Sequence, residues 1–138
     1  MTERRLFFLI NQSQRKLLHY VDSETEHRVG ISSVQAAALL AINVTQGSLL
    51  KEMGEALKLN NSAITGLTNR MEANQLIEKK PCSTDGRATR VFITEKGNKI
   101  LKNVGPMLQE LNTKLTESFS EKEVETIIRF LNHVIDIS

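Results

Sequence analysis

The sequence predicts a mainly α-helical domain that is interrupted once by a short β-hairpin. Apolar residues recur at helical spacing through most of the 138 residues, aromatic residues make up only 4% with no Trp, and one alternating stretch follows an Asp-Gly turn signal. Leu and Ile dominate the apolar residues, as is typical of helices packed on helices. The length suits one domain with its own core, so residues 1–138 are expected to form a single domain.

The first expected element is a long helix over residues 3–28. This stretch contains no Pro or Gly, and it carries apolar residues such as Leu6 and Ile10 at helical spacing. Gly30 is expected to end the helix, because glycine adopts the left-handed conformation that follows many helices.

Two shorter helices are expected next. Ser32 is a candidate N-cap with Gln35 three residues later, opening a helix through "AAALLAI" that "NVTQG" ends. Ser48 is expected to cap the following helix, "LLKEMGEAL".

The next helix, within "SAITGLTNRMEANQLI", has two distinct faces. Its apolar stripe points inward and consists of Ile64, Leu67 and Met71. The opposite face is small, polar and free of carboxylates, and it consists of Ser62, Thr65, Gly66 and Asn69. Two helices joined by a short connection are typical of a helix-turn-helix, which places its second helix in the major groove of DNA. A polar face is also typical of any exposed helix, so this helix alone leaves both interpretations open.

The hairpin favours the DNA-binding interpretation. Residues 76–81 and 90–95 are expected to pair as two antiparallel strands around the loop "STDGRAT". Arg87 at the tip is slim enough to enter a minor groove, and Lys79, Lys80 and Arg90 flank the loop within reach of phosphates. Residues 58–96 hold seven basic against four acidic side chains, although the net charge of the whole chain is only +2.

The order of these elements resembles a known family. The run "SLLKEMGEALKLNNSAITGLTNRMEANQLIEKKP" followed by "DGRATRVFITEKG" is similar to the winged helix-turn-helix of the MarR family of bacterial transcriptional regulators. The resemblance implies a DNA-binding region over residues 31–97 with a two-stranded wing, flanked by dimerisation helices at 1–30 and 98–138. It also implies a homodimer that binds a pseudo-palindromic operator as a repressor, or else as an activator. Members of the family commonly respond to a small aromatic or phenolic effector, to oxidation or to a metal.

The resemblance and the charge pattern together give the candidate DNA-binding residues. They are Ser62, Thr65, Gly66, Asn69, Arg70, Lys79, Lys80, Asp85, Arg87 and Arg90. Asp85 is expected to brace the loop while Arg87 projects outward. The chain departs from the family at Gly66, where relatives often carry a longer residue. It departs again at Gln75, which replaces a glycine, so that Asn74 or Gln75 must take a left-handed conformation, and asparagine tolerates it better.

The C-terminal third is expected to support dimerisation. Residues 94–119 carry apolar side chains at helical spacing, but Gly105 and Pro106 are expected to bend or break this helix. Ser120 and Glu123 form a capping box that opens a last helix. Its inward side is expected to consist of Val124, Ile127, Ile128, Leu131, Val134 and Ile135. Together with the first helix, this is more apolar surface than one winged domain can cover.

Other kinds of site have little support in the sequence. No two of His19, His27 and His133 stand four residues apart, so neither a metal nor a cofactor is expected. Cys82 is the one cysteine, which excludes an internal disulfide, and its redox activity stays open.

No catalytic constellation stands out, so an enzyme is the least favoured class. No apolar run approaches the ~18 residues that span a bilayer, and a cytoplasmic protein without a membrane partner is expected. The second hypothesis is a winged-helix adaptor that binds proteins and does not read DNA.

Overall fold

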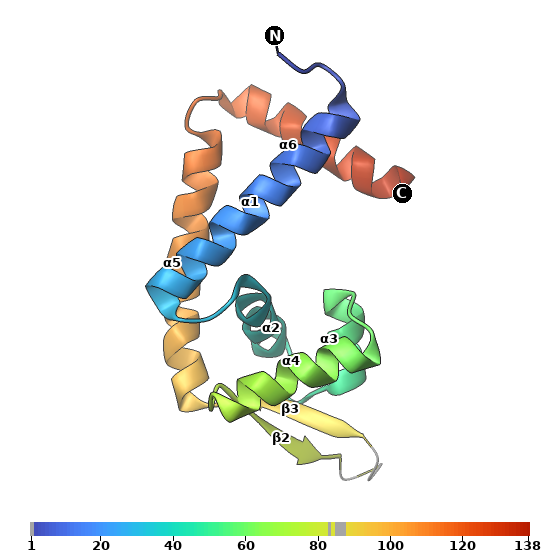
Figure 1. Cartoon of the computed structure of the whole chain (residues 1–138), viewed down its shortest axis with the longest axis vertical. Coiled ribbons are helices and arrows are strands. Elements are labelled where there is room, and N and C mark those ends of the chain that lie inside the picture. The colour runs from blue at the N-terminus through green and yellow to red at the C-terminus, as the bar shows by residue number, and fades with distance from the viewer. Residues whose placement is uncertain (1, 83, 85–87) are drawn as a thin grey trace. The chain divides into compact units, whose positions relative to one another are not determined.

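The computed structural model describes residues 2–82, 84 and 88–138. The elements in chain order (Figure 1) are α1 (Leu6–Val29), α2 (Ser33–Val44), β1 (Ser48–Leu49), α3 (Leu50–Leu57), α4 (Asn61–Ala73), β2 (Ile77–Pro81), β3 (Thr89–Ile93), α5 (Glu95–Thr116) and α6 (Glu121–Ile137). Met1–Val104 forms one compact unit and Gly105–Ser138 forms another. The mainly helical class with a β-hairpin is confirmed.

The core of the first unit lies between α2, α3, α4 and the sheet. Ile64, Leu67 and Met71 of α4 are buried, which confirms the inward stripe, and they join Leu39 of α2 and Val91 of β3 in one cluster. Full burial of such side chains stabilises the fold by about 1.5–3 kcal/mol each. The core therefore fixes which face of α4 is left for solvent.

The caps expected at Gly30 and Ser32 are present, and Asn60 provides a further one. Gly30 follows α1 with φ +76°, and the side chain of Ser32 accepts a hydrogen bond from the backbone N of Gln35 at the start of α2. Asn60 caps α4 in the same way, with its Oδ1 2.8 Å from the backbone N of Ala63. These local contacts satisfy backbone groups that a helix leaves unpaired.

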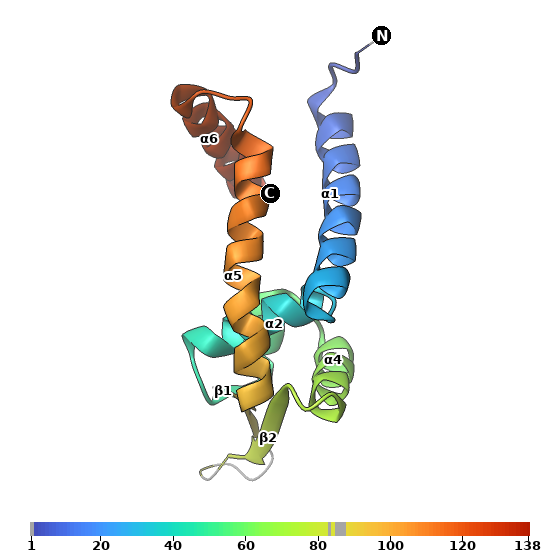
Figure 2. The same cartoon turned by 90° about the vertical axis from the view of Figure 1, so that its left-hand side faces the viewer.

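The expected role of Ser48 is wrong, and the sheet has one more strand than the hairpin. The strand order is β1-β3-β2, and Ser48 pairs with Val91 of β3. Strand β1 is labelled in Figure 2. Its hydroxyl donates to the carbonyl of Thr45, while Leu49 is the N-cap of α3 and its backbone N donates to Glu52. Pairing with β3 holds Ser48 in the sheet, one residue too early to cap the helix.

The left-handed residue after α4 is Gln75 and not Asn74. Gln75 has φ +63°, while Asn74 has φ −84° and closes the helix. The backbone N of Gln75 donates to Glu72 O, and that of Leu76 donates to Met71 O, both at 2.9 Å. This is a Schellman motif, which puts Leu76 against the core, where it is buried. The motif requires the left-handed residue directly before Leu76, so Gln75 takes this conformation although asparagine tolerates it better.

A carboxylate of α1 binds the beginning of α2. Oδ1 of Asp22 accepts from the backbone N of Ser33 at 2.9 Å and from its hydroxyl at 2.5 Å. The hydrogen bond from the Ser33 hydroxyl has the largest effect on the pKa of Asp22, and that from the Ser33 backbone N comes next. Both hold this pKa below its ordinary value of 3.8, and the nearby His19 lowers it further. An anion at a helix N-terminus is also favoured by the helix dipole.

We expect Asp22→Ala to lower the free energy of unfolding by about 1 kcal/mol at neutral pH, because the backbone N of Ser33 loses its partner. The pKa of Asp22 is lower in the folded than in the unfolded state, so its contribution is complete above the ordinary value of 3.8. It disappears as the pH falls below that value. Urea denaturation of both proteins from pH 7 to pH 3 should show the difference shrinking once the pH falls below 3.8, whereas Glu26→Ala on the same helix should change stability little. A constant difference down to pH 3 would contradict the assignment.

Gly47 precedes β1 at a point where a side chain would crowd the ring of Phe92. Its φ is +79°, its backbone N donates to Val91 O at 3.0 Å, and its carbonyl accepts from Nη1 of Arg90 at 2.7 Å. A Cβ on Gly47 would lie 3.1 Å from the ring of Phe92. Backbone conformation and crowding thus both require glycine.

We expect Gly47→Ala to cost about 2 kcal/mol of unfolding free energy, and Gly30→Ala only about 1 kcal/mol. Both glycines have positive φ, but a Cβ on Gly30 would meet nothing within 4 Å, so only Gly47 adds the contact with Phe92. Chemical denaturation of the two variants measures the difference. Equal losses would show that the ring moves aside freely.

Helix α5 is not broken at Gly105 and Pro106, where a bend or a break was expected. It runs over Glu95–Thr116 with Pro106 inside it, and Gly105 and Pro106 are both exposed. A proline removes one backbone hydrogen bond, and an exposed carbonyl one turn back can bond to water instead. The capping box of α6 is confirmed, since the Ser120 side chain accepts from the backbone N of Glu123 and the Glu123 carboxylate accepts from the backbone N of Ser120.

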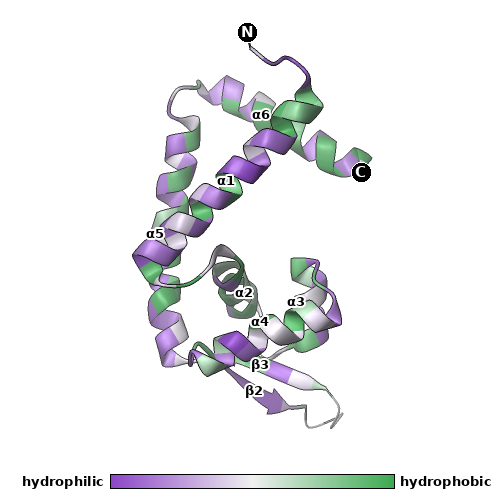
Figure 3. Ribbon diagram, in the orientation of Figure 1, coloured by the Kyte–Doolittle hydropathy of each residue, from purple (hydrophilic) through white to green (hydrophobic). Residues whose placement is uncertain are grey.

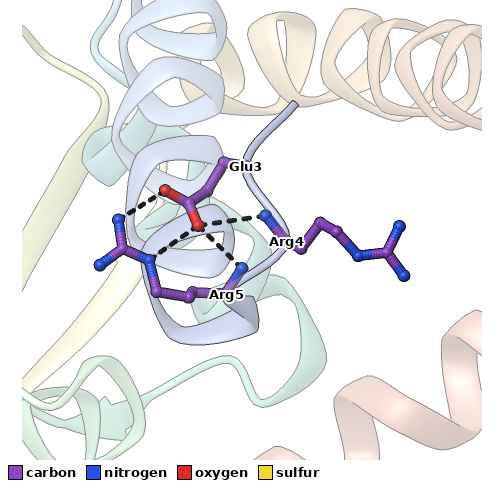
Figure 4. A network of polar contacts seen from close by, with 3 residues as sticks. All are labelled: Glu3, Arg4 and Arg5. Carbon is purple, nitrogen blue, oxygen red and sulfur yellow. Dashed lines mark hydrogen bonds and ion pairs between the residues drawn. The ribbon is translucent and has the colours of Figure 1, made fainter. Parts of the chain in front are cut away.

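The segment before α1 is held by one carboxylate. Oε1 of Glu3 accepts from the backbone N of Arg4 and Arg5, and both its oxygens bind the Arg5 guanidinium at 2.8–2.9 Å (Figure 4). These hydrogen bonds, led by that of the Arg5 side chain, lower the pKa of Glu3 to about 2. The Arg5 guanidinium also lies 4.3 Å from the centre of the Phe8 ring, which orients the first turn.

Large apolar side chains stay exposed on α6 and at the start of α1. Figure 3 colours apolar residues of both segments green. No described residue of α6 is buried, and Ile128, Leu131 and Ile135 are 53%, 47% and 68% exposed. Phe7 of α1 is 75% exposed. Among the described residues, the α6 side chains that were expected to point inward are therefore left partly or largely exposed. No helix among the described residues is long and apolar enough to cross a membrane.

Candidate nucleic-acid interface

Helices α3 and α4 form the expected helix-turn-helix. They are joined by three residues, of which Lys58 takes the left-handed conformation with φ +56° and Leu59 donates its backbone N to Gly54 O at 2.8 Å. A Cβ on Gly54 would lie 3.0 Å from the carbonyl oxygen of Leu59, so this glycine lets the turn close tightly. The turn fixes the direction in which α4 leaves α3.

The outer face of α4 is shaped by what its inner face buries. Thr68 is fully buried and its hydroxyl donates to Ile64 O at 2.8 Å, so this polar side chain is satisfied inside the core. Ser62, Thr65 and Asn69 are exposed on the other side. Hydroxyl and amide groups of this size can donate to and accept from base edges in a major groove.

Arg70 occupies the part of this face where Gly66 has no side chain. A Cβ on Gly66 would lie 3.4 Å from Nη1 of Arg70, so the guanidinium lies beside Gly66 on α4. Gly66 is half-buried and Arg70 is exposed. The guanidinium of Arg70 therefore supplies the basic group next to the position where Gly66 has no side chain.

The strands place the three basic residues of the hairpin in different surroundings. Lys79 donates from Nζ to Oδ1 of Asn69 on α4. The ammonium of Lys80 lies 5.1 Å from the centre of the Phe92 ring, on the other face of the strand. Arg90 binds the carbonyl of Gly47 and connects β3 to the turn before β1. Asp85 and Arg87 lie outside the described residues.

Three supporting residues were missed by sequence reasoning. Gln46 accepts from the backbone N of Ile93 at 3.2 Å, Gly47 binds β3 as described above, and Glu72 accepts from the backbone N of Lys79 at 3.3 Å. The first two are brought to β3 by a strand of two residues, which has no periodicity to detect. In the sequence, Glu72 could be noticed only as one of the four acidic residues within the mainly basic stretch 58–96.

The residues considered for a redox or metal site do not come together in the described part of the chain. Cys82 is buried, and its Sγ lies 3.2 Å from the hydroxyl oxygen of Thr84. Within the described part of the chain, no three His, Cys, Asp or Glu side chains gather as they would around a metal ion. The polar face of α4 and the adjoining strands are thus the arrangement that best suits a ligand, and that ligand would be double-stranded DNA.

Comparison with known proteins decides the family. The model of the MarR family matches residues 31–89. HTH-type transcriptional regulator MhqR of Bacillus subtilis is 26% identical over 136 residues, covering 97% of this chain and 93% of that protein. The organic hydroperoxide resistance transcriptional regulator of the same organism is 30% identical over 95 residues, covering 69% of this chain and 64% of that protein. The chain belongs to the MarR family.

Solved structures of MarR proteins share the whole fold. The Staphylococcus aureus MepR–DNA complex has a TM-score of 0.91 at 19% identity and covers 99% of this chain and 100% of that one. Streptococcus pneumoniae FabT in complex with DNA has a TM-score of 0.84 at 17% identity, covering 96% and 94%. The MarR match over residues 31–89 contains every candidate DNA-binding residue except Arg90, so the candidate interface coincides with the part by which the family is defined.

Proposed function

We propose that this MarR protein is a homodimeric repressor that binds a pseudo-palindromic operator and releases it when a small aromatic or phenolic effector binds. The observation that carries the proposal is the outer face of α4, which exposes Ser62, Thr65 and Asn69 without a carboxylate among residues 62–69. Such a face suits the major groove, where uncompensated carboxylates would meet the negative field of the phosphates. A repressor of bacterial genes works in the cytoplasm, where the chromosome lies.

Most of the candidate residues have a proposed role. Ser62, Thr65 and Asn69 face the bases, and Arg70 and Lys80 are placed for the phosphate backbone. Arg87 enters the adjacent minor groove, Asp85 braces the loop, and Arg90 positions the wing through Gly47. Solved relatives in complex with DNA support the proposal, as does one relative, PcaV of Streptomyces coelicolor, in complex with its natural ligand.

The dimer is proposed from the terminal helices. Residues 1–30 and 98–138 are expected to cover one another between two copies, because their apolar side chains are left exposed in one copy. A two-fold protein presents two α4 helices to two half-sites, so that the symmetry of the operator matches the symmetry of the protein. Residues 31–97 then serve as the DNA-binding region.

We expect Asn69→Ala to weaken binding to the operator by about 1–3 kcal/mol and to leave binding to random DNA almost unchanged, because a base contact carries sequence information and a phosphate contact does not. Electrophoretic mobility shifts at one fixed salt concentration measure both affinities, with an operator selected from a random pool of duplexes by the parent protein. Asn103→Ala, an exposed asparagine on α5, is the matched control. A parent protein that selects no sequence would refute the proposed function and leave a winged-helix adaptor as the alternative.

A further inference from the structure

The contact between Lys79 and Asn69 joins the wing to the recognition helix. Nζ of Lys79 donates to Oδ1 of Asn69, and the backbone N of Lys79 donates to Oε2 of Glu72 at 3.3 Å. Asn69 and Glu72 are one helical turn apart, so β2 meets the same side of α4 at both residues. The carboxylate of Glu72 holds the strand backbone, and the ammonium of Lys79 goes to the amide of Asn69.

The pleat of the sheet explains why Lys79 makes this contact and Lys80 does not. Lys79 stands opposite Val91, which is fully buried, so their side chains share the face that looks toward the helices. Lys80 stands opposite Arg90 on the other face, and its ammonium lies over Phe92. The two neighbouring lysines of β2 therefore make different contacts.

The contact decides which way the Asn69 amide is turned. An ammonium group has only donors, so it must face the amide oxygen, and the NH₂ group of Asn69 is directed away from Lys79. Asn69 is exposed while Lys79 is half-buried. With its oxygen turned to Lys79, Asn69 offers the protons of its NH₂ group, which are donors, to a ligand.

A donor-only pair suits one base edge better than the others. Asparagine alone recognises adenine by accepting from N6 and donating to N7, and this needs its oxygen. Guanine presents two acceptors, N7 and O6, in the major groove. We propose that Lys79 is a positioning residue that engages the Asn69 oxygen and makes the Asn69–Lys79 pair select guanine over adenine in each half-site. This inference rests on the proposed function, because it requires α4 to lie in the major groove.

The test is selection of binding sites from a random pool of DNA duplexes by the parent protein and four variants, followed by sequencing. The contacted position is the one where Asn69→Ala loses its base preference. There the parent is expected to prefer guanine over adenine by about tenfold or more, as for a good bidentate contact. Lys79→Met should lose that preference or turn it toward adenine, since Asn69 regains a free oxygen. Lys79→Arg keeps only donors and should retain guanine. Lys80→Met, from the opposite face of the strand, should weaken binding through loss of a phosphate contact but keep the preference for guanine.

A second readout separates positioning from phosphate binding. If Lys79 only orients Asn69, Lys79→Met leaves the slope of log affinity against log salt unchanged, whereas loss of a phosphate contact reduces that slope by about one unit. Unchanged base preference together with a reduced slope would overturn the inference and leave the proposed function standing. Selection of adenine by the parent would overturn it as well, while selection of no sequence would refute the function itself.

One measurement needs no variant of Lys79, because it changes the DNA at the position that Asn69→Ala identifies. Replacing the contacted guanine by 7-deazaguanine removes the N7 acceptor and leaves pairing intact, and it should weaken binding of the parent by about tenfold. Hypoxanthine at the same position lacks only the minor-groove amino group and should bind like guanine. If Lys79→Met does not show a parent-like thermal unfolding curve, the comparison of guanine with 7-deazaguanine replaces that variant as the test. Equal binding of the two DNAs would overturn the inference.

Discussion

Glutamate at both Ile128 and Leu131 is expected to convert the protein from a dimer into a monomer and to abolish operator binding. The two side chains are 53% and 47% exposed in the single chain, so their replacement removes no intramolecular core. Each buried apolar anchor of an interface contributes about 2 kcal/mol or more, and two buried carboxylates oppose association further, so the dimer should weaken by at least roughly a thousandfold. Sedimentation velocity at micromolar concentration should then show a species of 15.5 kDa.

The control places the same residue on the polar side of the same helix. Arg129→Glu combined with His133→Glu introduces at least as much negative charge, and both positions are exposed. This double variant should remain dimeric, because about half a helical turn separates these side chains from the apolar stripe. Monomers from both double variants would indicate a general effect of charge, and a dimer from the Ile128 and Leu131 variant would place the interface elsewhere. Far-ultraviolet circular dichroism establishes whether each variant is folded.

Local signals in the sequence were sufficient for most of the helices. Ser32, Asn60 and Ser120 accept hydrogen bonds from backbone groups a few residues away, so the chemistry that begins each helix is contained in a short stretch. The inward stripe of α4 is likewise a matter of spacing. These features depend on neighbours along the chain, and they could be predicted.

The features that were missed depend on partners far away in the sequence. Strand β1 exists because residues 48 and 49 meet β3 more than 40 residues later, and a two-residue strand has no pattern of its own. Gln75 takes the left-handed conformation because Leu76 must reach the core. The same reason applies to the candidate site: the polar face of α4 could be read from spacing, but the contact of Lys79 with Asn69 depends on the register of β2 against β3.

Gly97 is the residue at which a single added carbon should cost the most stability. A Cβ there would lie 2.3 Å from the carbonyl oxygen of Leu76 and 2.8 Å from Cγ2 of Ile93. The carbonyl cannot simply turn away, because it accepts from the backbone N of Thr94 at 3.1 Å. Thr94 also accepts from the backbone N of Gly97 at 3.0 Å and donates its hydroxyl to Gln75 O at 2.6 Å, so the first turn of α5 is bound to the connection between α4 and β2.

We expect Gly97→Ala to lower the free energy of unfolding by about 3 kcal/mol, at the upper end of the cost of overpacking, because the displaced atoms belong to the backbone. Gly105→Ala is the matched control in the same helix. A Cβ on Gly105 would meet nothing within 4 Å, so that substitution should stabilise the protein by about 0.5–1 kcal/mol through helix propensity alone. Urea denaturation of the two variants should therefore give changes of opposite sign. A gain in both would mean that α5 can move away from Leu76, and the wing would then have no fixed position relative to α4.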